Sequence, residues 1–138
     1  MSEALYHAAL VERARAAFGK GRLEGADASA TVDNPLCGDR VTLDLKLNEG
    51  RIAAIGHQVR GCLLCEAAAA TIAEHLRGGG PTEIEAISAA AKRLMKEGEG
   101  DPQWQCLEIF TPVHSAKSRR DCVLLPFEAL RRAASAAF

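Results

Sequence analysis

An alternating run of apolar and polar residues, followed by a turn and a second extended segment, constrains the fold of this chain most strongly. At positions 40–47 (RVTLDLKL) apolar side chains occupy every second position, which is the period of a strand with one buried face. The letters NEG at 48–50 are typical of a tight hairpin turn. Residues 51–60 and 30–34 also favour strands, so the sequence predicts a small, antiparallel sheet.

Most of the remaining chain has the periodicity of amphipathic helices. Helices are predicted at residues 3–18, at 62–76, after a capping box formed by Thr82 and Glu85, at 103–110, and in the final segment that contains Pro126. A proline is compatible with a helix in its first turn, so Cys122 is expected at or just before the start of the last helix. Residues 20–28 are expected to form a flexible connection. The predicted fold class is α+β, with helices packed against the sheet.

Length, charge and hydropathy exclude several classes of protein. A chain of 138 residues fits one compact domain with a hydrophobic core. The formal net charge of -1 gives no basic surface of the kind that binds nucleic acid. No apolar run reaches the length of a membrane span, and residues 1–20 lack the apolar region of a secretory signal. We therefore expect a cytoplasmic protein that binds neither nucleic acid nor membrane.

The cysteines are the residues with the most distinctive chemistry. Their odd number and the expected reducing compartment argue against a disulfide framework, which leaves metal binding, sulfur chemistry or simple burial. The chain has five, Cys37, Cys62, Cys65, Cys106 and Cys122.

Three of these cysteines fall at boundaries between predicted elements. Cys37 lies in a turn that enters a strand, Cys62 lies where a strand becomes a helix, and Cys122 is expected at a helix start. The N-terminus of a helix favours the thiolate, which is the form that binds soft metals and attacks sulfur. Asp39, in the same turn as Cys37, can add an oxygen ligand and complete a four-coordinate site. The alternative is that all three are incidental small residues.

Three motifs in this order resemble the U-type iron–sulfur assembly proteins, a family that comprises IscU, SufU and the N-terminal domain of NifU. They are NPLCGD (34–39), RGC (60–62) and RRDCVLLPFEAL (119–130). The resemblance covers nearly the whole chain, and it implies a single SufU-type domain over residues 1–138. It also implies a SufE/NifU-like fold, in which a three-stranded antiparallel sheet is packed against several helices.

The resemblance also implies a set of functional residues. Cys37, Asp39, Cys62 and Cys122 match the family's metal or cluster ligands, and the reactive roles would belong to Cys37, Asp39 and Cys122. The expected cofactor is zinc or a transient iron–sulfur cluster. Residues 95–113 occupy an insertion typical of the SufU branch, whose members resemble zinc-dependent sulfur acceptors.

The expected function is therefore iron–sulfur cluster assembly, as a scaffold, a persulfide acceptor or both. The expected partners are a SufS-like cysteine desulfurase and downstream cluster-assembly or carrier proteins, and the chain would act as a monomer or weak homodimer. Whether it should be classed as an enzyme, a sulfurtransferase-like acceptor, stays open.

Two other functions remain open at this point. A filled four-coordinate zinc site can be purely structural and serve an interaction module. The letters CLLC (62–65) also match a redox C-x-x-C pair, which would make the chain a thiol redox protein. Because Cys65 shares a helical stripe with apolar residues, we expect it to be a buried small residue. Cys106 is expected in the core, and His57 and His114 are expected to be structural.

Overall fold

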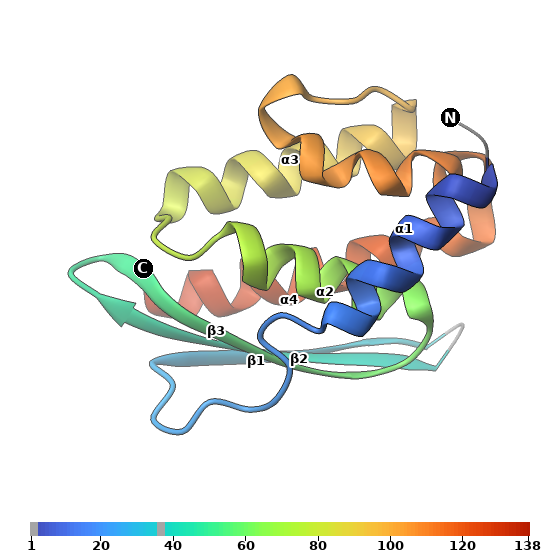
Figure 1. Cartoon of the computed structure of the whole chain (residues 1–138). Helices are drawn as coiled ribbons and strands as arrows, with labels where there is room; N and C mark the ends of the chain where they lie inside the picture. Colours follow the sequence, from blue (N-terminus) through green and yellow to red (C-terminus); the bar gives the residue numbers. More distant parts are fainter. Residues whose placement is uncertain (1–2, 36–37) are drawn as a thin grey trace.

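The computed structural model describes residues 3–35 and 38–138 of the chain. Three strands in the first half are followed by helices in the second half, after one leading helix (Figure 1). In chain order the elements are α1 (Glu3–Ala16), β1 (Ala28–Asn34), β2 (Asp39–Asn48), β3 (Arg51–Arg60), α2 (Leu63–His75), α3 (Pro81–Glu97), the 3-10 helix η1 (Pro102–Ser115) and α4 (Lys117–Ala137). The predicted α+β class with a three-stranded sheet is confirmed.

The sheet is antiparallel, with strand order β1-β2-β3. A two-residue turn joins β2 to β3, and both of its residues, Glu49 and Gly50, have positive φ angles of 52° and 76°. This is the requirement of a type I′ turn, whose twist matches that of the flanking strands. The hairpin predicted from the letters NEG is therefore confirmed.

All the helices lie on one side of the sheet, in two layers (Figure 1). Helices α2 and α4 pack on the strands and on each other, while α1, α3 and η1 pack against the outer side of these two helices. Four consecutive alanines at 67–70 in α2 are all fully buried, and their small side chains let neighbouring elements approach closely from several directions. The apolar side chains of β2 at 41, 43 and 45 are completely buried under this layer.

The other face of the sheet is covered in part by the segment after α1. The backbone at Gly21 hydrogen-bonds to His57, and Arg22 forms a 2.8 Å ion pair with the buried Asp44. A Cβ at Gly56 would lie 2.6 Å from the carbonyl oxygen of Gly21, so a side chain there would push this segment away. Residues 20–28 were expected to be a flexible connection, but these contacts fix the start of the segment on the sheet.

Two predicted helix starts are wrong. Helix α4 begins at Lys117, so Cys122 is its sixth residue and Pro126 lies inside the helix rather than in its first turn. Helix α3 has Gly80 at its N-cap and Pro81 at its first position, with no side-chain cap, so Thr82 and Glu85 form no capping box. Proline needs no hydrogen-bond partner at the first helical position, which makes this start favourable.

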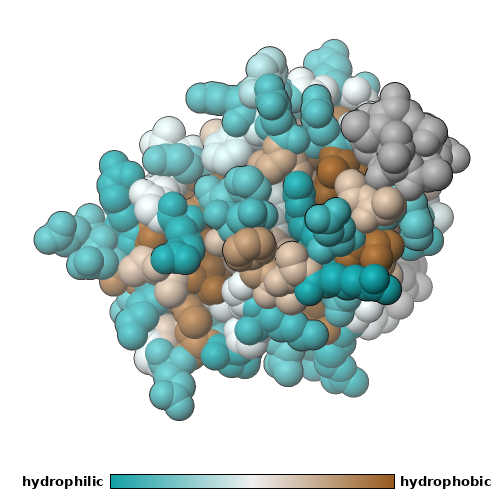
Figure 2. Space-filling view, in the orientation of Figure 1, coloured by the Kyte–Doolittle hydropathy of each residue, from teal (hydrophilic) through white to brown (hydrophobic). Residues whose placement is uncertain are grey.

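None of the helices in the described part of the chain combines the length and apolar character needed to span a membrane. The face of the molecule seen in Figure 2 is mostly hydrophilic, and its apolar areas are interrupted by polar side chains.

Candidate functional site

The candidate site lies at the end of the sheet where β2 begins and β3 ends. Arg40 pairs with Arg60 across the two strands, so Asp39 lies beside Gly61 in the connection to α2. A Cβ at Gly61 would lie 2.6 Å from Oδ1 of Asp39, which is closer than a real Cβ contact. Glycine at position 61 therefore lets the Asp39 carboxylate pack against the backbone, as the close-approach role of a glycine requires.

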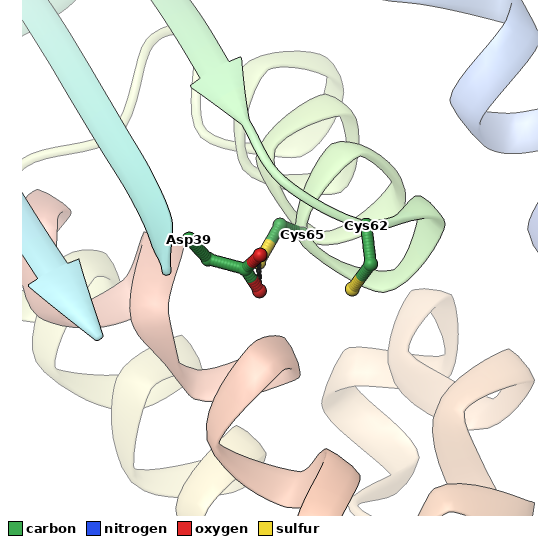
Figure 3. Close-up of side chains that lie close together, drawn as sticks. All are labelled: Asp39, Cys62 and Cys65. Atoms are coloured by element: carbon green, nitrogen blue, oxygen red, sulfur yellow. Dashed lines mark hydrogen bonds between the residues drawn. The ribbon is translucent and has the colours of Figure 1, made fainter. Parts of the chain in front are cut away.

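Three side chains converge here, Asp39 from β2, Cys62 from the connection between β3 and α2, and Cys65 from α2 (Figure 3). A carboxylate oxygen of Asp39 and the Sγ atoms of Cys62 and Cys65 all lie within 4.8 Å of one another. The Cys65 Sγ lies 3.2 Å from Oδ2 of Asp39, which is one of three acceptors, with the Cys122 carbonyl and Cys62, that share its single thiol proton. Ligand atoms at this separation, two sulfurs and one oxygen, can hold a single metal ion after small side-chain adjustments.

Cys62 is the thiol that favours its charged form. It is the N-cap residue of α2, with an extended backbone, and its side chain is half-buried. A hydrogen bond from the Cys65 thiol is the largest cause that lowers the pKa of Cys62, and the N–H groups of Cys65 and Leu64 and the Cys122 side chain add to it. Burial opposes these effects, and the resulting pKa is about 5. Cys62 is therefore a thiolate at neutral pH.

Cys65 has the opposite character. Its side chain is fully buried, and its pKa is raised by the hydrogen bond to Cys62, by burial and by Asp39. Its thiol lies 3.0 Å from the carbonyl oxygen of Cys122 as well as 3.2 Å from Asp39. In a continuous helix that carbonyl would accept a bond from the N–H of residue 126, which is a proline and has none. The Cys65 thiol of α2 can therefore supply the hydrogen bond that Pro126 of α4 cannot donate.

The sequence-predicted residues have different outcomes. Asp39 and Cys62 lie close together, where β2 begins and the chain leaves β3. Cys122 is buried in α4; its carbonyl oxygen lies 3.0 Å from the Cys65 thiol, and its side chain contacts Cys62. Because it is the sixth residue of the helix, its expected position at a helix N-terminus is wrong. Cys37 lies outside the described residues.

Cys65 is the residue whose part in the site was missed. Its predicted burial is confirmed, but its thiol contacts Asp39 and not only apolar neighbours. The C-x-x-C spacing was the available signal.

The remaining candidates lie elsewhere. Cys106 is half-buried and packs against the core. The ring of His57 is buried and bonded to the Phe18 carbonyl, while His114 bonds to the Met95 carbonyl at the end of α3. Their expected structural roles agree with these contacts.

The chemistry of this donor set is that of a borderline or soft metal, or of reactive sulfur. Thiolates with one carboxylate suit zinc and iron, whereas magnesium and calcium prefer oxygen ligands. A thiolate that is half-exposed can also attack a sulfur atom delivered from outside. One arrangement therefore serves both metal binding and sulfur transfer.

Comparisons with known proteins agree with the motifs. Residues 5–136 match the family described as NifU-like N terminal domain. The iron–sulfur cluster assembly scaffold protein IscU of Thermotoga maritima is 23% identical over 130 residues, which cover 94% of this chain and 92% of that protein.

Solved structures are similar as well. The N-terminal part of a NifU-like protein from Brucella abortus has a TM-score of 0.86 and 31% identity, covering 93% of this chain and 90% of that one. A scaffold protein for the SUF system (FiSufU) from Fervidobacterium islandicum has a TM-score of 0.86, covering 97% and 99%; at 23% identity it shows the fold alone. The chain belongs to the family of NifU-like N-terminal domains, the U-type scaffold proteins.

Proposed function

We propose that this chain is an assembly protein for iron–sulfur clusters, which receives sulfur from a cysteine desulfurase and holds the growing cluster as its cargo. The family assignment and the names of the relatives support the scaffold role. The observation that carries the proposal is the acidic, half-exposed Cys62 thiolate beside Asp39 and a second thiol. A site with one reactive thiolate at the surface and other ligands behind it can accept sulfur and then share it with a metal.

The proposed ligands are Cys37, Asp39, Cys62 and Cys122. The convergence of Asp39 and Cys62, with the Cys122 side chain close to Cys62, supports three members of this set. Zinc bound there would hold thiolates in a protected state and supply Lewis acidity. We propose that Cys62 receives the sulfur and that Cys37 and Cys122 act in its further transfer and release. We assign to Asp39 the role of the ligand that leaves first, because a carboxylate is harder and more exchangeable than thiolate.

The proposed partner is a desulfurase of the SufS type, and the acceptors of the finished cluster are carrier proteins. The chain would act in the cytoplasm as a single domain, as a monomer or weak homodimer. A structural zinc module is the competing role. The described residues already form a continuous apolar core from α2, α4 and the sheet, so metal is not needed to bury the apolar helix faces.

The test combines metal content with desulfurase turnover. The protein is purified without oxygen, its zinc, iron and acid-labile sulfide are measured, and it is titrated into a SufS-type desulfurase with cysteine and a dithiol reductant. We expect the rate of alanine formation to rise with added protein. The change Cys62→Ser should abolish this rise and lower metal affinity by at least about 100-fold, because one thiolate of a four-ligand site is lost.

Cys106→Ser is the matched control, since it removes a half-buried thiol away from the site. It should retain both metal and stimulation. If the desulfurase neither binds the protein nor turns over faster at any ratio, the acceptor role is wrong. If chelation of zinc then unfolds the protein, the structural module is the better explanation.

A further inference from the structure

The first turn of α2 places two thiols of unequal exposure within reach of each other. Cys62 is the N-cap residue and has extended backbone angles, φ -83° and ψ 171°, while Cys65 lies in the helix proper. Their Sγ atoms are no more than 4.8 Å apart. Residues three apart at a helix start can form a disulfide, because their Cβ atoms are roughly 5–6 Å apart and the bridged distance is about 4 Å. A small rotation at the N-cap covers the difference.

The difference in exposure sets an order of events. Cys62 is half-buried and can be reached from outside, whereas Cys65 is fully buried behind it. A sulfur donor in solution or on a partner protein therefore meets Cys62 first. Cys65 can react with whatever is attached to Cys62.

The surroundings of Cys65 supply a place for its proton. Its Sγ lies 3.2 Å from Oδ2 of Asp39, which is within reach for proton transfer to a carboxylate. The Cys122 carbonyl, 3.0 Å from the same sulfur, adds a fixed acceptor on the helix opposite. The two contacts hold the thiol between Asp39 and α4.

We propose that Cys65 is the resolving thiol for a persulfide on Cys62, and that it releases the outer sulfur as sulfide. This inference rests on the proposed function, since it names the fate of the sulfur received at that site. It concerns the protein before metal is bound, when Cys62 is not yet a metal ligand.

The step balances without a further reactant. Cys65 Sγ attacks Cys62 Sγ, the bond between Cys62 Sγ and the outer sulfur breaks, and the Cys62–Cys65 disulfide forms. The outer sulfur leaves with the electron pair of the broken bond and takes the thiol proton by way of Asp39, so it departs as hydrogen sulfide. The outer sulfur gains two electrons and the pair of cysteines loses two. A dithiol reductant returns the disulfide to two thiols before the next cycle.

This reaction would solve a chemical problem of cluster assembly. A persulfide carries sulfur at the oxidation level of the element, whereas a cluster contains sulfide. The C-x-x-C pair would supply the two electrons inside the site, at the position where metal is to be bound.

The experiment loads the metal-free protein with inorganic polysulfide under anaerobic conditions, so no desulfurase is needed. Excess polysulfide and all thiol reductants are then removed, and released sulfide is followed with time. Trypsin cleavage after the arginines at 60 and 77 gives a peptide, residues 61–77, whose cysteines are Cys62 and Cys65 alone. Mass spectrometry of this peptide distinguishes dithiol, persulfide and disulfide.

For the unmodified sequence we expect stoichiometric sulfide and a disulfide in the peptide. Cys65→Ser should retain the extra sulfur on Cys62 and release sulfide at least about tenfold more slowly, until a dithiol is added. Cys65→Ala serves as a second variant, in case the serine alters the hydrogen bonds to Asp39. Cys106→Ser is the matched control and should behave as the unmodified protein, and circular dichroism checks that each variant is folded.

Three outcomes would overturn the inference. Sulfide release from both Cys65 variants at the unmodified rate would show that Cys65 takes no part. A stable persulfide on Cys62 beside a reduced Cys65, in the unmodified protein, would show that the thiol does not resolve it. A peptide that gains neither sulfur nor a disulfide would remove Cys62 as acceptor. If polysulfide gives the disulfide but the desulfurase delivers no sulfur, the proposed function fails and this chemistry stands.

Discussion

Strand β2 carries two buried carboxylates with very different surroundings. Asp44 is fully buried and accepts hydrogen bonds from the Arg22 guanidinium, the Ser29 hydroxyl and the Leu23 N–H. Asp39 is 6% exposed, accepts a bond from the Cys65 thiol and lies next to a second cysteine. Because the two residues are five positions apart on a strand, they face opposite sides of the sheet. Asp39 faces the helices, and Asp44 faces the segment after α1.

These surroundings give the two carboxylates different roles. Asp44 stabilises the fold, whereas Asp39 belongs to the candidate site. Burial tends to raise the pKa of Asp44, but the bonds from Arg22, Ser29 and Leu23 outweigh it, and the pKa is lowered. The Asp44 carboxylate is already stabilised by a cation and by further hydrogen-bond donors, so exchanging these partners for a metal ion would be unfavourable. A carboxylate that lies among thiols can exchange a hydrogen bond for a metal ion. The same residue type therefore serves the fold at one position and the site at the other.

The largest expected effect is on the free energy of unfolding, which should fall more when Asp44 is replaced than when Asp39 is replaced. Asp44→Ala should lower the free energy of unfolding by about 2–3 kcal/mol, because several bonds to a buried charge are lost together. Metal affinity should stay unchanged. Asp39→Ala should keep substantial metal on the remaining thiolates and cost less stability, but it should alter sulfur transfer per folded molecule. Denaturant unfolding and metal titration on the same preparations measure both quantities.

Acid unfolding gives an independent check of this contrast. Since the folded-state pKa of Asp44 is below its ordinary value of 3.8, its stabilisation is present above about pH 4 and is lost as pH falls toward the folded pKa. Asp44→Asn should therefore remove part of the loss of stability below pH 4. A larger stability loss for Asp39→Ala than for Asp44→Ala would contradict the assigned roles.

Two glycines allow each carboxylate's surroundings to be disturbed without removing a charge. A Cβ at position 61 would collide with Asp39 at 2.6 Å, and a Cβ at position 56 would collide with Leu23 at 2.8 Å. Both Gly61→Ala and Gly56→Ala should cost about 1–2 kcal/mol of stability through overpacking. Only Gly61→Ala should also weaken zinc binding, by about tenfold, because it displaces a ligand. Isothermal titration with zinc distinguishes the two.

Gly100→Ala is the neutral control, since no atom lies within 4 Å of the added Cβ and the residue has no positive φ. If Gly56→Ala weakens zinc binding as much as Gly61→Ala does, the two sides of the sheet are coupled and not independent.

The sequence predicts the hairpin that carries Asp39 better than it predicts the contacts that Asp39 makes with distant segments. The alternating run and the NEG turn predict that β2 and β3 pair as a hairpin, which brings the start of β2 near the start of α2. They do not predict the irregularity between Lys46 and Leu47, which shifts the register by one residue and pairs Arg40 with Arg60. The position of Cys62 follows from the same hairpin. Local pattern is enough for the hairpin itself, because its two strands are also neighbours in sequence.

Contacts between distant segments could not be predicted in this way. Periodicity places Cys65 on a buried stripe, but its contact with Asp39 joins residues that are 26 positions apart. The rule for proline misplaced the start of α4 because it considers the helix alone. In the folded chain, the Cys65 thiol on another helix lies 3.0 Å from the carbonyl that Pro126 cannot serve, and this carbonyl shares the thiol proton with Asp39.

The smallest expected effect concerns this proline, and it tests how the Cys65 proton is shared between Asp39 and α4. Pro126→Ala restores an N–H that can bond to the Cys122 carbonyl within the helix. Removing a proline from a helix interior is worth up to about 3 kcal/mol, but the buried ring also loses packing, so we expect a net stabilisation of about 1 kcal/mol. With the carbonyl occupied, the thiol should donate more fully to Asp39. The infrared S–H stretching band should then shift to the frequency of a thiol bonded to a carboxylate, and Cys65→Ser in the same background should remove the band. An unchanged band together with unchanged stability would show that the proline is tolerated for reasons unconnected with Cys65, and that Asp39 already holds the proton alone.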